Sequence, residues 1–322
     1  MIPFLLRRLI AGLPTLLAVT LLVFTLTHLL PGDPIRLLLG EEANPQLAAD
    51  LRRQLGLDRP VLVQYLGWLG GLLQGDFGRS LKNNLPVGSV ILEKLPTTVQ
   101  LSFLAMLVAV GISVPTGVFA ALRRGSWWDG GITALALTGI SLPNFFLGIL
   151  LIYAFSIRLG WIPPSGYVEP WVDLRKNLLL LLLPAITLGT ALAGALTRFV
   201  RNSLLEVLSQ DYVRTARAKG LAERVVIFKH ALRNAAIPVV TVMGLQLGGL
   251  LGGAVVTEQI FSIPGFGRLV VDAVLNRDFP VLQAVVLLAA LAVFLVNVLV
   301  DLLYAAIDPR SFATCYPIGW RW

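Results

Sequence analysis

Long apolar blocks separated by short polar stretches dominate the pattern of this chain. A helix needs about 20 predominantly apolar residues to cross the hydrocarbon core of a bilayer. Six blocks approach or exceed that length, so the pattern predicts an all-α integral membrane protein with six transmembrane helices: residues 9–30, 97–122, 131–157, 178–197, 236–256 and 281–307. Internal prolines remove backbone donors and should kink three of these helices, at Pro115, Pro143 and Pro184.

The composition agrees with a lipid environment. Hydrophobic residues form 56% of the 322 residues and charged residues only 14%, whereas soluble domains carry about 25% charged residues. The single cysteine, Cys315, excludes an intrachain disulfide framework and a cysteine-rich metal site. The first apolar block is too long for a signal-peptide core and lacks a small-residue cleavage site, so we expect a retained first span.

The positions of the basic residues give an orientation. The net charge of +8 does not indicate a nucleic-acid partner, because the Lys and Arg residues lie between apolar blocks and are not interleaved with stacking aromatics. Fourteen Lys and Arg fall on the side that holds both ends of a six-span chain, against five in the opposite short loops. Positive charge accumulates in cytoplasmic loops, so both termini are predicted to be cytoplasmic.

Residues 31–96 are too long for a bare connection and too polar to span. Pro31-Gly-Asp-Pro34 is a turn-rich stop after residues 1–30, the predicted N-terminus and first span. Apolar residues recur at helical spacing within 44–57, which predicts one or two short external helices. This segment serves either as a lid packed on the span ends or as a substrate contact, and the pattern leaves both open.

The stretch 198–235 within the predicted permease core, 97–307, is rich in helix formers but too polar to span. Tyr212, Thr215, Ala216 and Lys219 share one helical face, and the glycine at 220 is a natural helix stop. A short amphipathic helix held at the membrane surface suits docking into a groove on a partner protein.

The sequence lacks the motifs of an energy-converting or catalytic site. It contains no phosphate-binding G-x-x-x-x-G-K-[ST], no H-E-x-x-H and no G-x-S-x-G. The two histidines, His28 and His230, fall on opposite predicted sides of the membrane. We therefore expect no catalytic residue, no metal site and no cofactor in this chain. Residues 263–267 are interpreted as an external turn, with part of an outer gate as the alternative.

Polar and small residues inside the spans have several interpretations. Gln246 and Asn297 are candidates for lining a transport pathway, because amides facing lipid would be costly. Asp301 lies toward the cytoplasmic end of its span, which favours a structural role over a proton relay. A row of glycines predicts close helix packing and also suits a helix that borders the pathway: Gly244, Gly248 and Gly252.

Taken together, several segments are similar to a known family. Residues 211–220 with 229–238 resemble the cytoplasmic EAA loop of ABC-importer permeases, in the form found in the dipeptide, oligopeptide, glutathione and nickel branch. Thr215-Ala-Arg217 stands where the generic loop has Glu-Ala-Ala, as is usual in that branch. Further segments are similar to the first permease subunit of that family's pair: 30–34, 54–58, 75–80, 139–143, 159–163 and 258–267. Residues 312–322 have no match.

The resemblance implies a type I permease fold in the bacterial inner membrane, with a cytoplasmic tail at 308–322. It implies four further partners besides lipid: a second permease, two ATPases that bind ATP and Mg²⁺, and an external solute-binding protein. The substrate class would be short peptides. The ATPase-coupling residues would be Asp211, Tyr212, Arg214, Thr215, Ala216, Lys219 and Gly220.

Two rival hypotheses come from other classes of protein. An ion-driven carrier should show inverted repeats and mid-membrane acids, and no clear repeat is visible. An intramembrane enzyme should carry one of the catalytic constellations that are missing.

Overall fold

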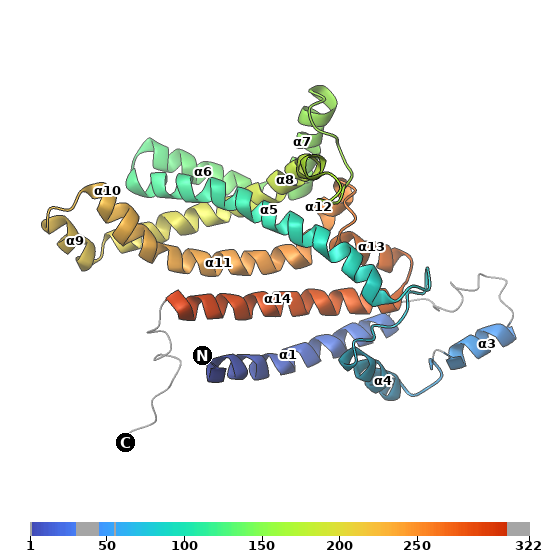
Figure 1. The fold of residues 1–322 in the computed structure, drawn as a ribbon. Helices are drawn as coiled ribbons and strands as arrows, with labels where there is room; N and C mark the ends of the chain where they lie inside the picture. The colour runs from blue at the N-terminus through green and yellow to red at the C-terminus, as the bar shows by residue number, and fades with distance from the viewer. Residues whose placement is uncertain (1, 30–44, 55, 308–322) are drawn as a thin grey trace, which may run out of the picture. The chain divides into compact units, whose positions relative to one another are not determined.

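The computed structural model describes residues 2–29, 45–54 and 56–307 (Figure 1). Within these ranges the regular elements are helices, and the one pairing of extended backbone is an isolated bridge between Arg79 and Pro86. The all-α prediction is therefore confirmed. The predicted turn at 31–34 and the predicted tail at 308–322 lie outside the described residues.

The described chain forms two compact units. The first unit contains residues up to 99 together with 263–294. Its elements are α1 (Ile2–Leu29), α3 (Pro45–Gln54), α4 (Val61–Leu73), the start of α5 (Val87–Leu122), α13 (Phe266–Leu275) and the start of α14 (Phe279–Ile307). Its core joins α5, α13 and α14 through Val87, Ile91, Phe266, Ala273, Val281, Ala284 and Val285.

The second unit contains residues 100–262 and the described chain from 295 onward. It adds α6 (Trp127–Ser141), α7 (Asn144–Leu151), the π-helical η1 (Ile152–Arg158), α8 (Leu174–Leu208), α9 (Asp211–Ala218), α10 (Glu223–Val225), the π-helical η2 (Val226–Ala231), α11 (Leu232–Gly253) and α12 (Val255–Ile260). Helix α8 is the central element, because α6, α7 and α11 all pack against it.

In the described part of the chain, five helices are long and apolar enough to cross a membrane, and one bent pair of helices brings the number to six if the pair crosses as one span. Helix α6 and the helix that begins at Asn144 are bent by 98° at the break. Leu142 is extended there, because a proline disfavours helical backbone in the residue before it, and Pro143 is extended as well. Five to six spans agree roughly with the predicted six, and the predicted third span is broken at residues 142–143 rather than kinked.

Two predicted boundaries differ from the observed helices. Helix α5 begins at Val87, so residues 87–96 of the predicted external segment are its first turns. Helix α8 continues to Leu208, eleven residues beyond the predicted end of its span. Pro115 and Pro184 lie inside α5 and α8, which remain single helices.

Glycines let the helices of the second unit approach closely. A Cβ on Gly117 or Gly189 would stand 2.8 and 2.7 Å from backbone oxygens of Thr197 and Ala105. A Cβ on Gly194 would stand 2.5 Å from the Ala136 oxygen. Since real Cβ contacts are not this short, only glycine fits at these positions. The backbones of α5, α6 and α8 are therefore in direct contact there.

The predicted glycine row on α11 is placed as follows. Gly244 meets the Val300 side chain of α14 so closely that a Cβ would clash, which fits the predicted close packing. Gly248 is buried. Gly252 lies near the end of α11, and the surroundings of its position are outside the described part of the chain.

Candidate functional site

Helix α9 is a short helix between two long ones, at one end of the second unit (Figure 1). It begins after the extended Gln210 and ends where Gly220 adopts φ +77°. This left-handed conformation is unfavourable for residues with a Cβ and free for glycine. The predicted helix stop at Gly220 is therefore confirmed.

The inward side of α9 is apolar. Val213 and Ala216 are buried and pack with Val226 of η2. Tyr212, Thr215 and Lys219 are exposed instead. Of the four positions predicted to share a helical face, Ala216 differs from the other three in being buried, because its methyl group packs against its own chain.

Two polar contacts hold the helix in place. The Arg217 guanidinium donates to both carboxylate oxygens of Glu223, at 2.7 and 3.1 Å, across the Gly220 turn. These hydrogen bonds raise the pKa of Arg217 and lower the pKa of Glu223. The Asn234 amide donates to the Tyr212 hydroxyl at 2.9 Å, which connects α9 to the start of α11.

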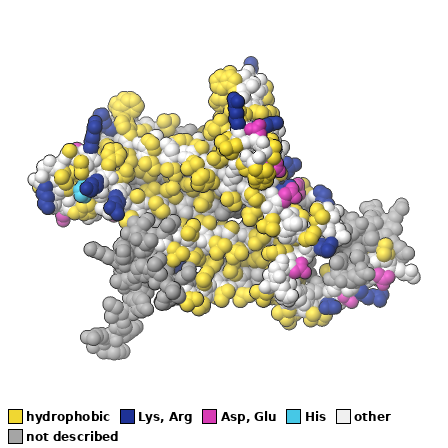
Figure 2. All heavy atoms as spheres, viewed as in Figure 1, with side chains coloured by type: hydrophobic (Ala, Val, Ile, Leu, Met, Phe, Trp, Pro, Cys, Tyr) yellow, Lys and Arg dark blue, Asp and Glu magenta, His cyan; other side chains and the backbone are white. Residues whose placement is uncertain are grey.

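The outward side of α9 is polar and accessible. Asp211, Arg214, Thr215 and Lys219 are exposed. Arg214 and Asp211 lie 3.5 Å apart with 72% and 95% of their side chains exposed, a geometry in which an ion pair contributes little to stability. Figure 2 shows Lys and Arg side chains gathered around this end of the unit. These groups are free to meet a partner protein.

A buried ion pair connects α6 to the extension of α8 that leads into α9. The Arg201 guanidinium donates to both Asp129 oxygens at 2.6 and 2.8 Å. Asp129 also accepts the Gly125 N–H at 3.0 Å, and only 8% of its side chain is exposed. Sequence reasoning missed this pair, because its members are 72 residues apart and each belongs to a cluster of ordinary loop charges.

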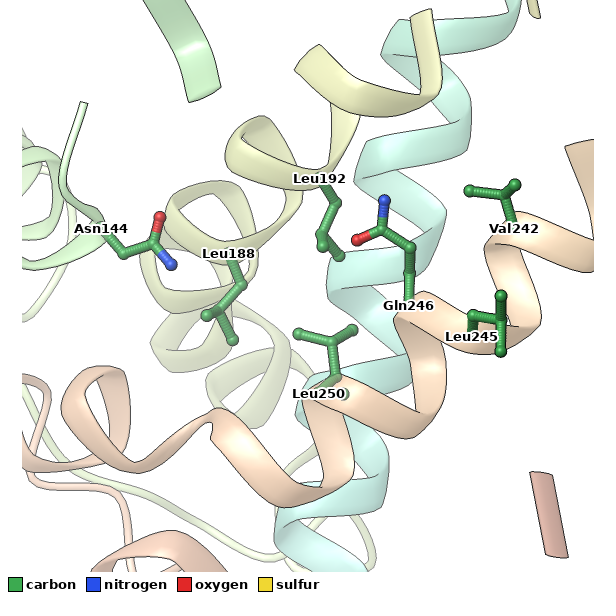
Figure 3. Close-up of a pocket in the computed structure, with 8 residues that line it drawn as sticks. Asn144, Leu188, Leu192, Val242, Leu245, Gln246 and Leu250 are labelled. Atoms are coloured by element: carbon green, nitrogen blue, oxygen red, sulfur yellow. The ribbon is translucent and has the colours of Figure 1, made fainter. Parts of the chain in front are cut away.

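A pocket of about 460 Å³ lies among α7, α8 and α11 (Figure 3). Its walls are mainly apolar, with two carboxamides, Asn144 at the left of the view and Gln246 right of its centre. Gln246 thus lines a cavity, and its place on a transport pathway stays a prediction. Asn297 is half-buried on α14 and does not line this pocket. Asn144 is not among the candidates predicted from the sequence, since a single amide after a proline carries no signal of a pocket.

The described residues contain no group of three His, Cys, Asp or Glu side chains that could hold a metal ion. A carboxamide can donate and accept hydrogen bonds but carries no charge. The pocket therefore suits neutral polar groups, and α9 suits protein docking.

The comparisons with known proteins agree with this arrangement. Residues 113–312 match the family described as binding-protein-dependent transport system inner membrane component, and residues 1–102 match the N-terminal region of such membrane components. The glutathione transport system permease protein GsiC of Salmonella choleraesuis is 49% identical over 309 residues, covering 96% of this chain and 98% of the relative. The protein of that name from Escherichia coli K12 is 47% identical over the same length.

A solved structure shares the fold. The chain resembles one in an inward-facing structure of the MetNI methionine ABC transporter, with a TM-score of 0.58 and 18% identity. The match covers 68% of this chain and 96% of that one. The resemblance inferred from residues 211–238 is confirmed. This chain belongs to the family of inner membrane components of binding-protein-dependent transport systems.

Proposed function

We propose that this chain is a permease subunit of an ATP-driven importer for glutathione or other short peptides in the bacterial inner membrane. The observation that carries the proposal is the 49% identity to a glutathione permease, which extends over 96% of the chain. Short peptides carry neutral amide groups, and the carboxamides of Asn144 and Gln246 can form transient hydrogen bonds with them during transport.

The energy would enter through α9. The exposed side chains of Asp211, Arg214, Thr215 and Lys219 form the surface that docks into an ATPase. Movement of the ATPases would push α9, and the continuous helix α8 would carry that movement into the membrane. A ligand shifts such an equilibrium only through different contacts in the two states, so the docking surface must be gripped differently before and after ATP binding.

The proposed assembly contains a second related permease, two cytoplasmic ATPases and an external solute-binding protein. ATP and Mg²⁺ bind the ATPases. This chain supplies part of the transport pathway and the helices that transmit the movement of the ATPases to it. Both termini are cytoplasmic in this arrangement, as the excess of Lys and Arg in the loops on that side also predicts.

Reconstitution of the four kinds of subunit in vesicles tests the proposal. We expect glutathione uptake that requires ATP and the solute-binding protein and that persists when a protonophore dissipates the ion gradient. Uptake that needs no ATP and collapses with the protonophore would identify an ion-driven carrier instead.

A charge reversal tests the docking surface separately. Arg214→Glu should weaken recovery of the ATPases with the purified permease, since it inverts an exposed charge on α9. The matched control is Arg175→Glu, which reverses an exposed arginine at the opposite end of α8. Equal ATPase recovery in both variants would remove Arg214 from the docking surface.

A further inference from the structure

Helix α4 differs from the polar segment around it. It is a 13-residue helix in which leucine, valine and aromatic residues predominate. The chain has no charged residue between Arg59 and Asp76, so α4 is uncharged along its whole length. A helix of this size is about 20 Å long, which is too short to cross a hydrocarbon core of about 30 Å.

Specific contacts hold α4 against α1. The hydroxyl groups of Tyr65 and Thr20 share a hydrogen bond of 2.9 Å. The Phe24 ring lies 5.3 Å from the Tyr65 ring and 5.7 Å from the Trp68 ring, between centroids. Thr20 and Phe24 are both buried, so this side of α4 is a packed interface.

The contact points on α1 set the depth of α4. The apolar span of α1 covers Arg8–Thr27. Thr20 lies seven residues before the end of that span, which corresponds to about 10 Å along the helix axis. The Tyr65 contact therefore reaches about a third of the way through a hydrocarbon core of about 30 Å. A helix bound at that depth cannot lie wholly in water.

The opposite side of α4 is apolar and exposed. Leu62, Leu66 and Leu73 are 69%, 57% and 83% exposed. On α1, to which α4 is bound, Leu21 and Leu22 are also exposed and lie within the membrane-spanning part. Exposed leucines at the depth of a membrane-spanning helix are covered by phospholipid acyl chains, so we take acyl chains as the occupant of this side of α4.

The ends of α4 suit this environment. Backbone groups inside hydrocarbon must be hydrogen-bonded within the protein. The helix begins after Pro60, which has no N–H to satisfy, and the Gln64 amide donates to the carbonyls of Leu57 and Arg59. The N–H of Gln74 is bonded to the Gly71 carbonyl at the other end.

We propose that α4 is a membrane-embedded helix that lies beside α1 in the leaflet containing the Thr27 end of the span, with its exposed leucines covered by lipid. The segment between the first two spans is then only partly external. This inference is independent of the transported substrate and of the docking role of α9.

Spin labels on single cysteines test the proposal. Cys315→Ser removes the native thiol, and Leu62→Cys and Leu66→Cys each place a label on the exposed side of α4. The full chain is purified with its transporter subunits and reconstituted in phosphatidylethanolamine and phosphatidylglycerol vesicles. Leu21→Cys on α1 is the lipid control, and Arg53→Cys on the charged helix α3 is the aqueous control.

We expect both α4 labels to collide with oxygen as often as the Leu21 label does. Their ratio of oxygen to nickel-chelate accessibility should lie several-fold above the ratio at Arg53. A ratio equal to that at Arg53 would place α4 in water and overturn the proposal. Low accessibility to both reagents would show that another protein covers α4, which would equally overturn it.

Discussion

The ion pair between Asp129 and Arg201 should be a main support of the second unit. Its two charge-assisted hydrogen bonds measure 2.6 and 2.8 Å, and 8% and 22% of the two side chains are exposed. The variant Asp129→Asn keeps the shape of the side chain and removes its charge. Arg201 then stays largely buried without a counter-charge.

The expected loss follows from that burial. Removing one partner of a fully buried pair destabilises a protein by about 3–5 kcal/mol. Because 22% of the Arg201 side chain still reaches the surface, we expect a smaller loss, about 2–3 kcal/mol. The double variant Asp129→Asn with Arg201→Gln should lose less than the sum of the single losses, with a coupling of about 1–3 kcal/mol.

Unfolding in mixed detergent micelles, followed by circular dichroism, measures these free energies. The control is Asp50→Asn, which removes a partner of Arg53 at 3.8 Å where the side chains are 64% and 71% exposed. Such a surface pair contributes at most about 1 kcal/mol. The reasoning would be refuted if Asp129→Asn lost no more than Asp50→Asn, or if the single losses were additive.

Three further predictions concern other parts of the chain. Gly220→Val should abolish transport while ATP hydrolysis continues, because a Cβ in left-handed backbone costs about 1–2 kcal/mol. Gly220→Asn should retain transport, since asparagine tolerates that conformation. Equal uptake by both variants would contradict the proposed role of α9 in transmitting the movement of the ATPases. Gln246→Leu should reduce glutathione uptake several-fold with unchanged assembly, and wild-type uptake would remove Gln246 from the pathway. Asp278→Asn should make residues 76–86 more sensitive to protease, since the buried carboxylate accepts hydrogen bonds from the Ser80 hydroxyl and the Leu81 N–H. Hydrogen bonds to charged groups contribute about 1.5–3 kcal/mol. Unchanged cleavage would show that this carboxylate does not anchor the loop.

The sequence predicted the features that depend on local signals. A run of apolar residues long enough to cross a bilayer identifies a span wherever it occurs, which is why the long helices were found. The end of α9 was found because glycine favours the left-handed backbone that Gly220 adopts.

Other features depend on residues that are distant along the chain. The inward position of Ala216 is set by Val226 of η2, which a helical-face argument restricted to α9 cannot include. The contact of Arg217 with Glu223 needs the geometry of the turn between them. Proline illustrates the same limit, because Pro184 stays within a helix supported by its neighbours, whereas the chain breaks at Pro143.

Helix α4 was missed for a different reason. Averaged over residues 31–96, the polar and charged positions conceal a short uncharged stretch. Only its contacts with Thr20 and Phe24 reveal at what depth that stretch lies.

The glycine contacts along α8 restrict the kinds of motion that the second unit can make. Sliding α8 past α5 by one helical turn, about 5.4 Å, would bring Ala185 or Ala193 to the Ala105 carbonyl, where Gly189 leaves no room for a Cβ. Gly194 imposes the same restriction against α6. The three helices are therefore held together where these glycines meet their neighbours, and the second unit can bend more easily at the breaks between its helices, at residues 142–143 and 209–210.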